Sequence, residues 1–203
     1  MPRTETFRDR QSSQGMPVNK THLSLGQLTP RLGDVQANLD VHLQMIEEAR
    51  DHKSDLVLFP ELSLSGYQLK DIVPDVALHR HSPQWKQLQE ASLGLSVGVG
   101  FVEESDDHRF FNSYAFFEDG ALKHVHRKVY LPTYGLFEEG RLYAAGEHIR
   151  AFDSSFGRCG VVLCEDVWHP SMLYVLSMDG AEIIIAAAAS PIRGADVGEE
   201  GSN

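Results

Sequence analysis

The sequence predicts a single α/β domain in which helices cover a β-sheet, and two patterns carry this prediction. Between residues 22 and 59 an alternating stretch, an amphipathic stretch and an apolar run follow one another, which is the order of a βαβ unit. Residues 161–163 form a second apolar run typical of a buried strand. The 203 residues suffice for one domain with a substantial core but not for two ordinary domains.

The first βαβ unit can be followed residue by residue. Leu23 and Leu25 alternate with polar residues, which predicts a strand within 22–28. Asp34 can serve as the N-cap of the helix that follows. Along that helix apolar residues recur at spacings of three and four: Val35, Leu39, Leu43, Ile46 and Ala49. Residues 55–59 form a short buried strand ended by Pro60, so the loop from Pro60 lies where open α/β sheets place their chemistry.

The later elements are expected from turn and cap signals. Ser82-Pro83 predicts a helix with Ser82 as the N-cap and proline at its first position. The other expected elements are a strand at 95–102, a hairpin of strands 110–117 and 121–129 turned at 118–120, a long ordered loop at 131–146, strand structure at 152–163 with a turn near 154–155, a short helix after Pro170 that ends at Gly180, and a buried strand at 182–189.

Composition narrows the class of protein. The formal net charge of −11 argues against nucleic acid or an anionic membrane surface as the main partner. No apolar run approaches a membrane span, and residues 1–20 read as a polar, disordered arm without the apolar centre of a signal peptide. The two cysteines, Cys159 and Cys164, are placed on opposite faces of one strand, which favours a reducing, cytoplasmic setting. The folded domain is expected at 21–193, followed by a flexible tail at 194–203.

Three polar side chains lie at or just after the ends of predicted strands: Glu61, Lys128 and Cys164. If these strand ends meet at one edge of a sheet, the carboxylate can take the thiol proton and the ammonium can stabilise the thiolate and then an oxyanion. That chemistry describes attack on an amide or nitrile carbon. Taken singly, each residue has an ordinary reading: a helix cap or loop carboxylate, a solvated edge-strand lysine, and a structural cysteine. Their conjunction favours catalysis.

Three segments resemble the signatures of the nitrilase, or carbon–nitrogen hydrolase, superfamily: Leu-Phe-Pro-Glu at 58–61, Arg-Lys-Val-Tyr-Leu-Pro at 127–132 and Cys-Glu-Asp at 164–166. The resemblance implies a four-layer αββα sandwich, here incomplete at its C-terminal end. It also implies Glu61 as general base, Lys128 as cation, Cys164 as nucleophile and a second glutamate at Glu139. Members of the superfamily associate through symmetric interfaces, so a homo-oligomer is expected.

Within the superfamily, the segments at 60–67, 131–139 and 164–170 are most similar to the glutaminase domains of glutamine-dependent NAD synthetases. That likeness implies that Glu165 and Ser190 hold the amino-acid end of the substrate and that Tyr134 and Phe137 line the pocket. A carboxylate at Glu165 suits an ammonium group. An alternative role for Glu165 is a supporting contact to Lys128.

The expected reaction is therefore thiol-dependent hydrolysis of glutamine with release of ammonia, without a metal or cofactor. The ATP-binding loop of the synthetases is absent from the sequence, so a separate ATP-dependent synthetase domain or chain would receive the ammonia. Two alternatives stay open. One is a free-standing amidase or N-carbamoyl hydrolase that acts on another small substrate. The other is an inactive fragment that serves as a scaffold, since the superfamily normally continues through further strands.

Overall fold

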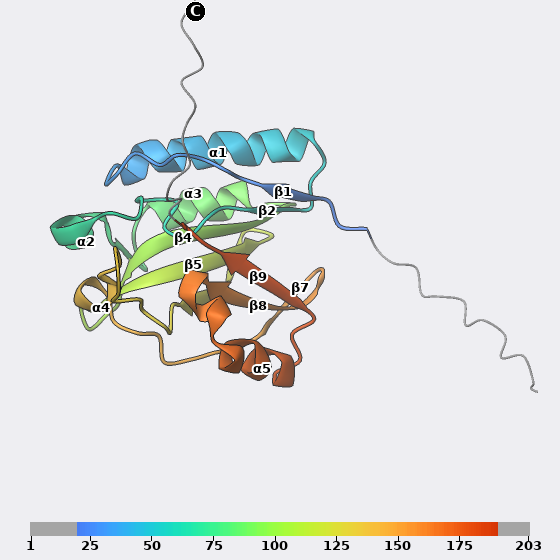
Figure 1. Cartoon of the computed structure of the whole chain (residues 1–203). Helices are drawn as coiled ribbons and strands as arrows, with labels where there is room; N and C mark the ends of the chain where they lie inside the picture. Colours follow the sequence, from blue (N-terminus) through green and yellow to red (C-terminus); the bar gives the residue numbers. More distant parts are fainter. Residues whose placement is uncertain (1–19, 191–203) are drawn as a thin grey trace, which may run out of the picture.

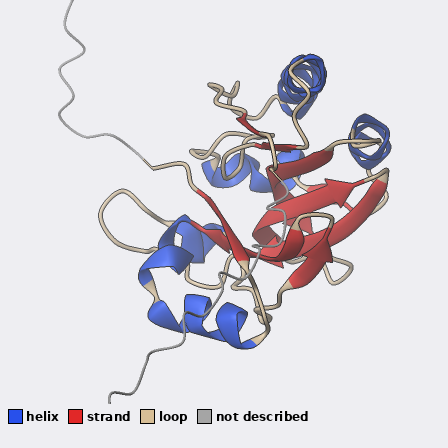
Figure 2. Ribbon diagram, turned by 90° about the vertical axis from the view of Figure 1, so that its right-hand side faces the viewer, coloured by secondary structure: helices blue, strands red, loops and turns tan. Residues whose placement is uncertain are grey.

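The chain forms four layers, two β-sheets face to face with helices on both outer sides (Figure 1). The structure, a computed structural model, describes residues 20–190. The expected tail at 194–203 and the expected arm, apart from Lys20, lie outside the described residues. The layered arrangement confirms the predicted αββα sandwich, and Figure 2 shows the helices flanking the strands from a second direction.

The first sheet contains six strands, in the order β1–β2–β4–β5–β6 with β3 paired to β4. Their bounds are β1 Leu23–Leu25, β2 Leu56–Leu58, β3 Leu78–His79, β4 Ser96–Glu104, β5 Phe110–Glu118 and β6 Ala121–Arg127. The second sheet has the order β7–β8–β9, with bounds Phe152–Ser154, Gly157–Leu163 and Ile183–Ala187. Helices α1 (Val35–Asp51) and α3 (Gln84–Ala91) cover the first sheet, and α5 (Pro170–Met178) covers the second (Figure 1).

Strand directions decide where the strand ends meet. β2 runs parallel to β4, and β4–β5 and β5–β6 are antiparallel pairs, so β6 runs in the same direction as β2. Glu61 after β2 and Lys128 after β6 therefore leave the first sheet at the same end. Cys164 follows β8, which belongs to the second sheet. The expectation that all three residues meet at one edge of a single sheet is wrong in this respect, because they meet between two sheets.

Three apolar layers hold the sandwich together. Helices α1 and α3 pack on the first sheet through a cluster that includes Leu39, Ile46, Leu88, Val97, Phe101 and Phe117. The two sheets pack on each other through Tyr114, Phe116, Phe152, Val161, Leu163 and Ile185. Helix α5 packs on the second sheet through Val162, Met172 and Leu176. Alternate residues of a strand point to opposite faces, so neighbours such as Phe116 and Phe117 belong to different layers.

Several local predictions are confirmed. The side chain of Asp34 accepts a hydrogen bond from the backbone N–H of Ala37 at 3.1 Å and caps α1 as expected. The β5–β6 hairpin turns through Asp119 and Gly120, both with positive φ, as a two-residue hairpin turn requires. The strand region 152–163 divides into antiparallel β7 and β8 at the predicted turn.

Other local predictions need correction. Helix α3 begins at Gln84 with Pro83 as its N-cap residue and no side-chain cap, so Ser82 does not have the predicted role. The 3-10 helix at Lys70–Ile72 and the short helices α2 (Val73–Val76) and α4 (Glu139–Leu142) were not expected, because one helical turn is too short to show a 3.6-residue period. Among residues 20–190, no helix is long and apolar enough to cross a membrane.

Candidate active site

A buried lysine lies between two carboxylates where β6 ends. Lys128 Nζ donates to Glu61 Oε1 at 2.8 Å and to Glu139 Oε1 at 2.7 Å, and the lysine and both carboxylates are buried. Burial alone lowers the pKa of Lys128, but the charges of Glu61 and Glu139 outweigh it and the pKa is raised. Lys128 is therefore positively charged at neutral pH although it is buried.

Glu61 is oriented by groups from both sheets. Its Oε1 also accepts a hydrogen bond from Asn112 Nδ2 on β5 at 2.8 Å. Its Oε2 accepts from the backbone N–H of Ala189, just beyond β9, at 2.9 Å. The loop from Pro60 fits closely against β4, because a Cβ on Gly100 would lie 2.4 Å from the Pro60 carbonyl oxygen. The carboxylate is thus fixed in position, as a general base must be.

Glu139 is the first residue of α4, and a phenol supports it. Tyr67 donates its hydroxyl to Glu139 Oε1, the oxygen that also contacts Lys128. Burial raises the pKa of Glu139, while Lys128 and Tyr67 oppose that rise. Its other oxygen, Oε2, is buried and has no hydrogen-bond partner among the described residues. That oxygen has a free acceptor position next to the lysine.

Cys164 begins a 3-10 helix, Cys164–Trp168, directly after β8. Its φ of 43° is in the left-handed region, which is uncommon for a residue other than glycine and bends the chain sharply as it leaves the sheet. Burial and then the charge of Glu61 raise the pKa of the Cys164 thiol, while Lys128 and a hydrogen bond with Ser190 lower it. The thiol therefore lies within the electrostatic reach of the Glu61–Lys128–Glu139 cluster.

A second carboxylate–phenol pair lies beside the thiol. Tyr134 donates its hydroxyl to Glu165 Oε2 at 2.7 Å, and His169 Nε2 lies 3.6 Å from Glu165 Oε1. Phe137 packs edge-on against the Tyr134 ring, with ring centroids 5.7 Å apart. The contacts of Glu165 are thus Tyr134 and His169, whereas those of Lys128 are Glu61 and Glu139, which does not favour a role for Glu165 in supporting the lysine.

The sequence matches known proteins over most of its length. Residues 22–200 match the carbon–nitrogen hydrolase family model. The chain belongs to the carbon–nitrogen hydrolase family. It is 34% identical to the glutamine-dependent NAD(+) synthetase of Thermotoga maritima over 179 residues. The aligned region covers 86% of this chain and 31% of that protein.

Solved structures of carbon–nitrogen hydrolases have the same fold. The glutamine-dependent NAD+ synthetase of Acinetobacter baumannii superposes with a TM-score of 0.76 at 28% identity, over 84% of this chain and 32% of that one. Nit3 of Saccharomyces cerevisiae, a member of branch 10 of the nitrilase superfamily, superposes with a TM-score of 0.73 at 25% identity, over 84% of this chain and 65% of that one. The chain thus spans about a third of the length of the synthetases it matches.

In this carbon–nitrogen hydrolase the structure brings together all the residues that the sequence singled out. Glu61, Lys128 and Glu139 are in contact, Cys164 contacts Ser190 and lies within reach of that cluster, and Glu165 contacts Tyr134. Sequence reasoning missed the groups that support them: Tyr67, Asn112 and the backbone of Ala189. No group of three or more His, Cys, Asp or Glu side chains in residues 20–190 is arranged to hold a metal ion.

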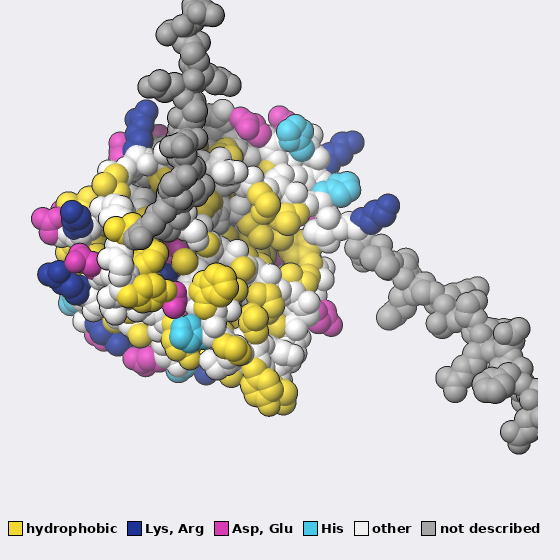
Figure 3. All heavy atoms as spheres, in the orientation of Figure 1, with side chains coloured by type: hydrophobic (Ala, Val, Ile, Leu, Met, Phe, Trp, Pro, Cys, Tyr) yellow, Lys and Arg dark blue, Asp and Glu magenta, His cyan; other side chains and the backbone are white. Residues whose placement is uncertain are grey.

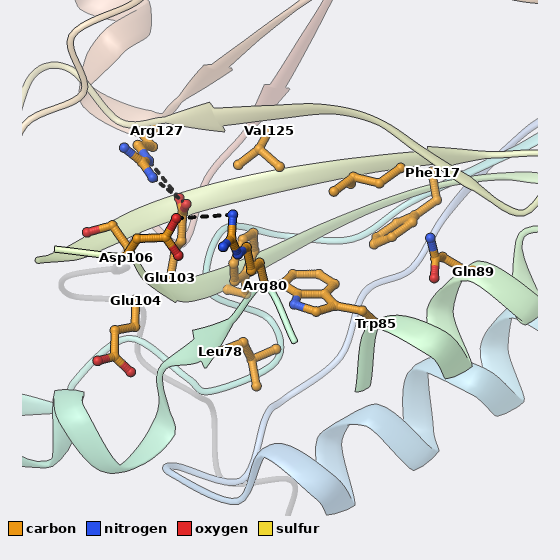
Figure 4. A pocket seen from close by; sticks show the side chains of 13 residues that line it. Leu78, Arg80, Trp85, Gln89, Glu103, Glu104, Asp106, Phe117, Val125 and Arg127 are labelled. Atoms are coloured by element: carbon orange, nitrogen blue, oxygen red, sulfur yellow. Dashed lines mark hydrogen bonds and ion pairs between the residues drawn. The ribbon is translucent and has the colours of Figure 1, made fainter. Parts of the chain in front are cut away.

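A separate cavity of about 240 Å³ lies beside α3, on the face of the first sheet that points away from the second sheet (Figure 4). Arg127 lines it and donates to both oxygens of Glu103, at 2.8 and 2.6 Å, while Trp85 and Phe117 form an apolar wall. Arg127 and Lys128 are neighbours in sequence with contacts on opposite sides of the sheet. The two cations therefore have separate environments, and Arg127 offers a matched control for Lys128.

Proposed function

We propose that this chain hydrolyses the side-chain amide of glutamine through a thioester on Cys164 and releases ammonia. The observation that carries the proposal is the thiol, held at a sharp turn beside a buried lysine that two carboxylates contact. A base and a cation, both buried, together with a half-buried nucleophile are the groups that acyl transfer from an amide requires.

Each group has a step in the proposed reaction. Glu61 Oε2 accepts one backbone hydrogen bond and keeps a lone pair that can take the Cys164 proton. The thiolate then attacks the amide carbon. Lys128 uses two N–H groups on carboxylates, which leaves its third to stabilise the oxyanion.

The adduct collapses as the C–N bond breaks and Glu61 returns the proton to the leaving nitrogen, so that ammonia departs and a thioester remains. Water replaces ammonia, and a carboxylate takes its proton while the oxygen attacks the thioester carbon. Breaking the C–S bond then yields the carboxylic acid and restores the thiol. Glu139 Oε2, the unpartnered buried oxygen, is a second acceptor next to Lys128 for an N–H or O–H of the reacting groups.

Glutamine is favoured by the groups beside the thiol and by the similar proteins. The Glu165 carboxylate, together with Tyr134, is suited to bind an ammonium group, which a simple aliphatic amide lacks. The relatives described above are named glutamine-dependent NAD synthetases. The alternative, a free-standing amidase or N-carbamoyl hydrolase, has the support of the likeness to Nit3, of which the chain covers about two thirds.

The decisive experiment combines a mass measurement with an ammonia assay. The chain is incubated with L-glutamine, with other small amides and with diazo-oxo-norleucine. We expect one label on Cys164, ammonia from glutamine, and neither in Cys164→Ala. Cys159→Ala is the matched control, since Cys159 lies within β8 and contacts Ser154 instead of the cluster. Ammonia release by Cys164→Ala would refute the mechanism. Turnover of another amide in place of glutamine would support the alternative, and a folded chain without labelling would support an inactive scaffold.

We also propose a homo-oligomer and an ammonia-consuming synthetase as partners. Apolar side chains gather over α5 and β9 (Figure 3). On α5, Tyr174 is 67% exposed and Met178 72%, and Trp168 at the end of the preceding 3-10 helix is 78% exposed. Exposed apolar side chains in such number are typical of a surface that another protein covers. Sedimentation of the chain alone should show a dimer or larger species that Tyr174→Glu dissociates.

A further inference from the structure

One buried carboxylate connects the end of β6 to the turn that carries Cys164. Asp166 is fully buried, and its Oδ1 accepts from the backbone N–H groups of Val129 at 3.1 Å and Tyr130 at 2.9 Å. Its Oδ2 accepts from the backbone N–H of Leu163 at 3.1 Å and from His126 Nε2 at 3.0 Å. His126 is buried as well, and it must be the donor because a carboxylate only accepts.

These donors belong to the two sheets. His126 lies on β6 and Val129 follows its end, on either side of Lys128 in the first sheet. Leu163 is the last residue of β8 in the second sheet, directly before Cys164. The Asp166 carboxylate thus binds the residues that flank the cation and the residue that precedes the nucleophile. A shift of one sheet against the other would break hydrogen bonds to this carboxylate.

The turn needs such a restraint. A residue other than glycine with φ of 43° is strained and persists where its surroundings hold it. The bond from Leu163 N–H to Asp166 closes the turn around Cys164. Next to it, the rings of Tyr130 and His169 stack with centroids 3.5 Å apart and also connect the two segments.

We infer that Asp166, together with His126, is a positioning residue that sets the place of the Cys164 thiol relative to the Lys128 ammonium. This inference rests on the proposed function for its catalytic meaning. The geometric claim stands apart from it, since it concerns the distance between a thiol and a cation. An ordinary reading is that Asp166 only satisfies buried backbone N–H groups and adds stability. The two readings differ in whether Asp166 changes the effect of Lys128 on the thiol.

The experiment measures the pKa of the Cys164 thiol from the pH dependence of iodoacetamide alkylation, with mass spectrometry of the peptide that contains it. Any accessible thiol reacts, so the measurement does not require glutaminase activity. Lys128→Gln removes a charge that lowers this pKa, so it should raise the pKa in the wild-type background. In the Asp166→Asn background, where the turn is released, Lys128→Gln should leave the pKa unchanged.

Asp166→Asn keeps the shape of the side chain but presents an N–H group to one of the two pairs of N–H donors, either that of Val129 and Tyr130 or that of Leu163 and His126. Diazo-oxo-norleucine should label Cys164 about 100-fold more slowly in this variant, the loss expected for a displacement of about 1 Å. His126→Phe leaves three of the four hydrogen bonds and should shrink the effect of Lys128→Gln without removing it. If Asp166→Asn does not fold, the His126→Phe variant tests the inference in its place.

The matched control is His124→Phe, on the same strand and the same face as His126. His124 stacks on Phe152, and its Nε2 has no partner among the described residues, so this change should alter neither the thiol pKa nor the labelling rate. An equal effect of Lys128→Gln with and without the Asp166 carboxylate would overturn the inference. No effect of Lys128→Gln on the wild-type thiol would overturn it too. A lack of ammonia from glutamine, with the alkylation results as expected, would refute only the proposed function.

Discussion

The two tyrosines near Glu139, Tyr67 and Tyr143, offer a sharp test of the site, because only one of the two hydroxyl groups has a hydrogen-bond partner among the described residues. Tyr67 donates its hydroxyl to Glu139 Oε1, whereas the Tyr143 hydroxyl is buried and has no hydrogen-bond partner among the described residues. Tyr→Phe removes the same single oxygen at both positions. The resulting changes in the free energy of unfolding should differ in size and in sign.

The expected magnitude follows from the charge of the acceptor. A hydrogen bond to a charged group contributes roughly 1.5–3 kcal/mol, so Tyr67→Phe should destabilise the fold by about that amount while Glu139 is ionised. Once Glu139 is protonated the bond joins neutral groups, and its contribution falls to about 0.5–1.5 kcal/mol. Tyr143→Phe removes a buried hydroxyl that lacks a partner, and it should be neutral or stabilising.

The pH dependence gives an independent check. Burial raises the pKa of Glu139, so this group contributes stability below the ordinary carboxyl pKa that is lost as the pH rises through the raised value. Tyr67 acts against this rise because it stabilises the ionised form. Tyr67→Phe should therefore cost more at a pH above the titration of Glu139 than at a pH below it.

Urea unfolding followed by tryptophan fluorescence, at one pH on each side of that titration, measures both differences. A loss in Tyr67→Phe that is the same at both pH values would refute the assignment of the bond to an ionised Glu139. A Tyr143→Phe variant as unstable as Tyr67→Phe would show that the loss is one of packing.

Three further predictions concern the cation, the substrate and the layers. Lys128→Gln should slow the labelling of Cys164 by diazo-oxo-norleucine by at least about 100-fold, as the loss of an oxyanion donor does. Arg127→Gln, on the opposite face of the sheet, should be labelled at the wild-type rate. Equal labelling rates in the two variants would argue against Lys128 as the oxyanion donor. Glu165→Gln should raise KM for glutamine about tenfold with little change in kcat, since it weakens a charge-assisted bond to the substrate, and an unchanged KM would argue for another substrate class. Phe116→Ala and Phe117→Ala should each lose about 3–5 kcal/mol in urea unfolding, but only the former, between the sheets, should also slow Cys164 labelling.

The sequence was most informative where a chemical group follows a strand. Glu61 and Cys164 could be selected because each follows an apolar run with a group that rarely stands at the end of a buried strand without a partner, whereas Lys128 follows Arg127 and was selected by its place at a predicted strand end and by the family resemblance. Hydrophobic pattern, together with turn and cap signals, predicted every described strand except β3 and the three longer helices α1, α3 and α5. The family resemblance added Glu139, which lies at the start of a helix too short to predict.

The supporting contacts could not be predicted, because they join residues far apart in the chain. Tyr67 and Glu139 are separated by 72 positions, and Ala189 lies 128 positions from Glu61. A single tyrosine or a backbone N–H carries no pattern that marks its partner. The assignment of Cys164 to a second sheet was missed for a similar reason, since an apolar strand does not reveal which sheet it joins.

The division of the site between two sheets has a consequence for its stability. Glu61 and Lys128 are fixed to the first sheet and Cys164 to the second, so the distance between cation and thiol depends on how the sheets pack. Apolar packing between the sheets is strong but not directional. Hydrogen bonds are directional, and two polar groups that cross between the sheets do so at the site itself: the buried Asp166 carboxylate and the half-buried N–H of Ala189. The apolar layer therefore holds the sheets together, and these polar contacts fix their alignment at the point where the proposed chemistry depends on it.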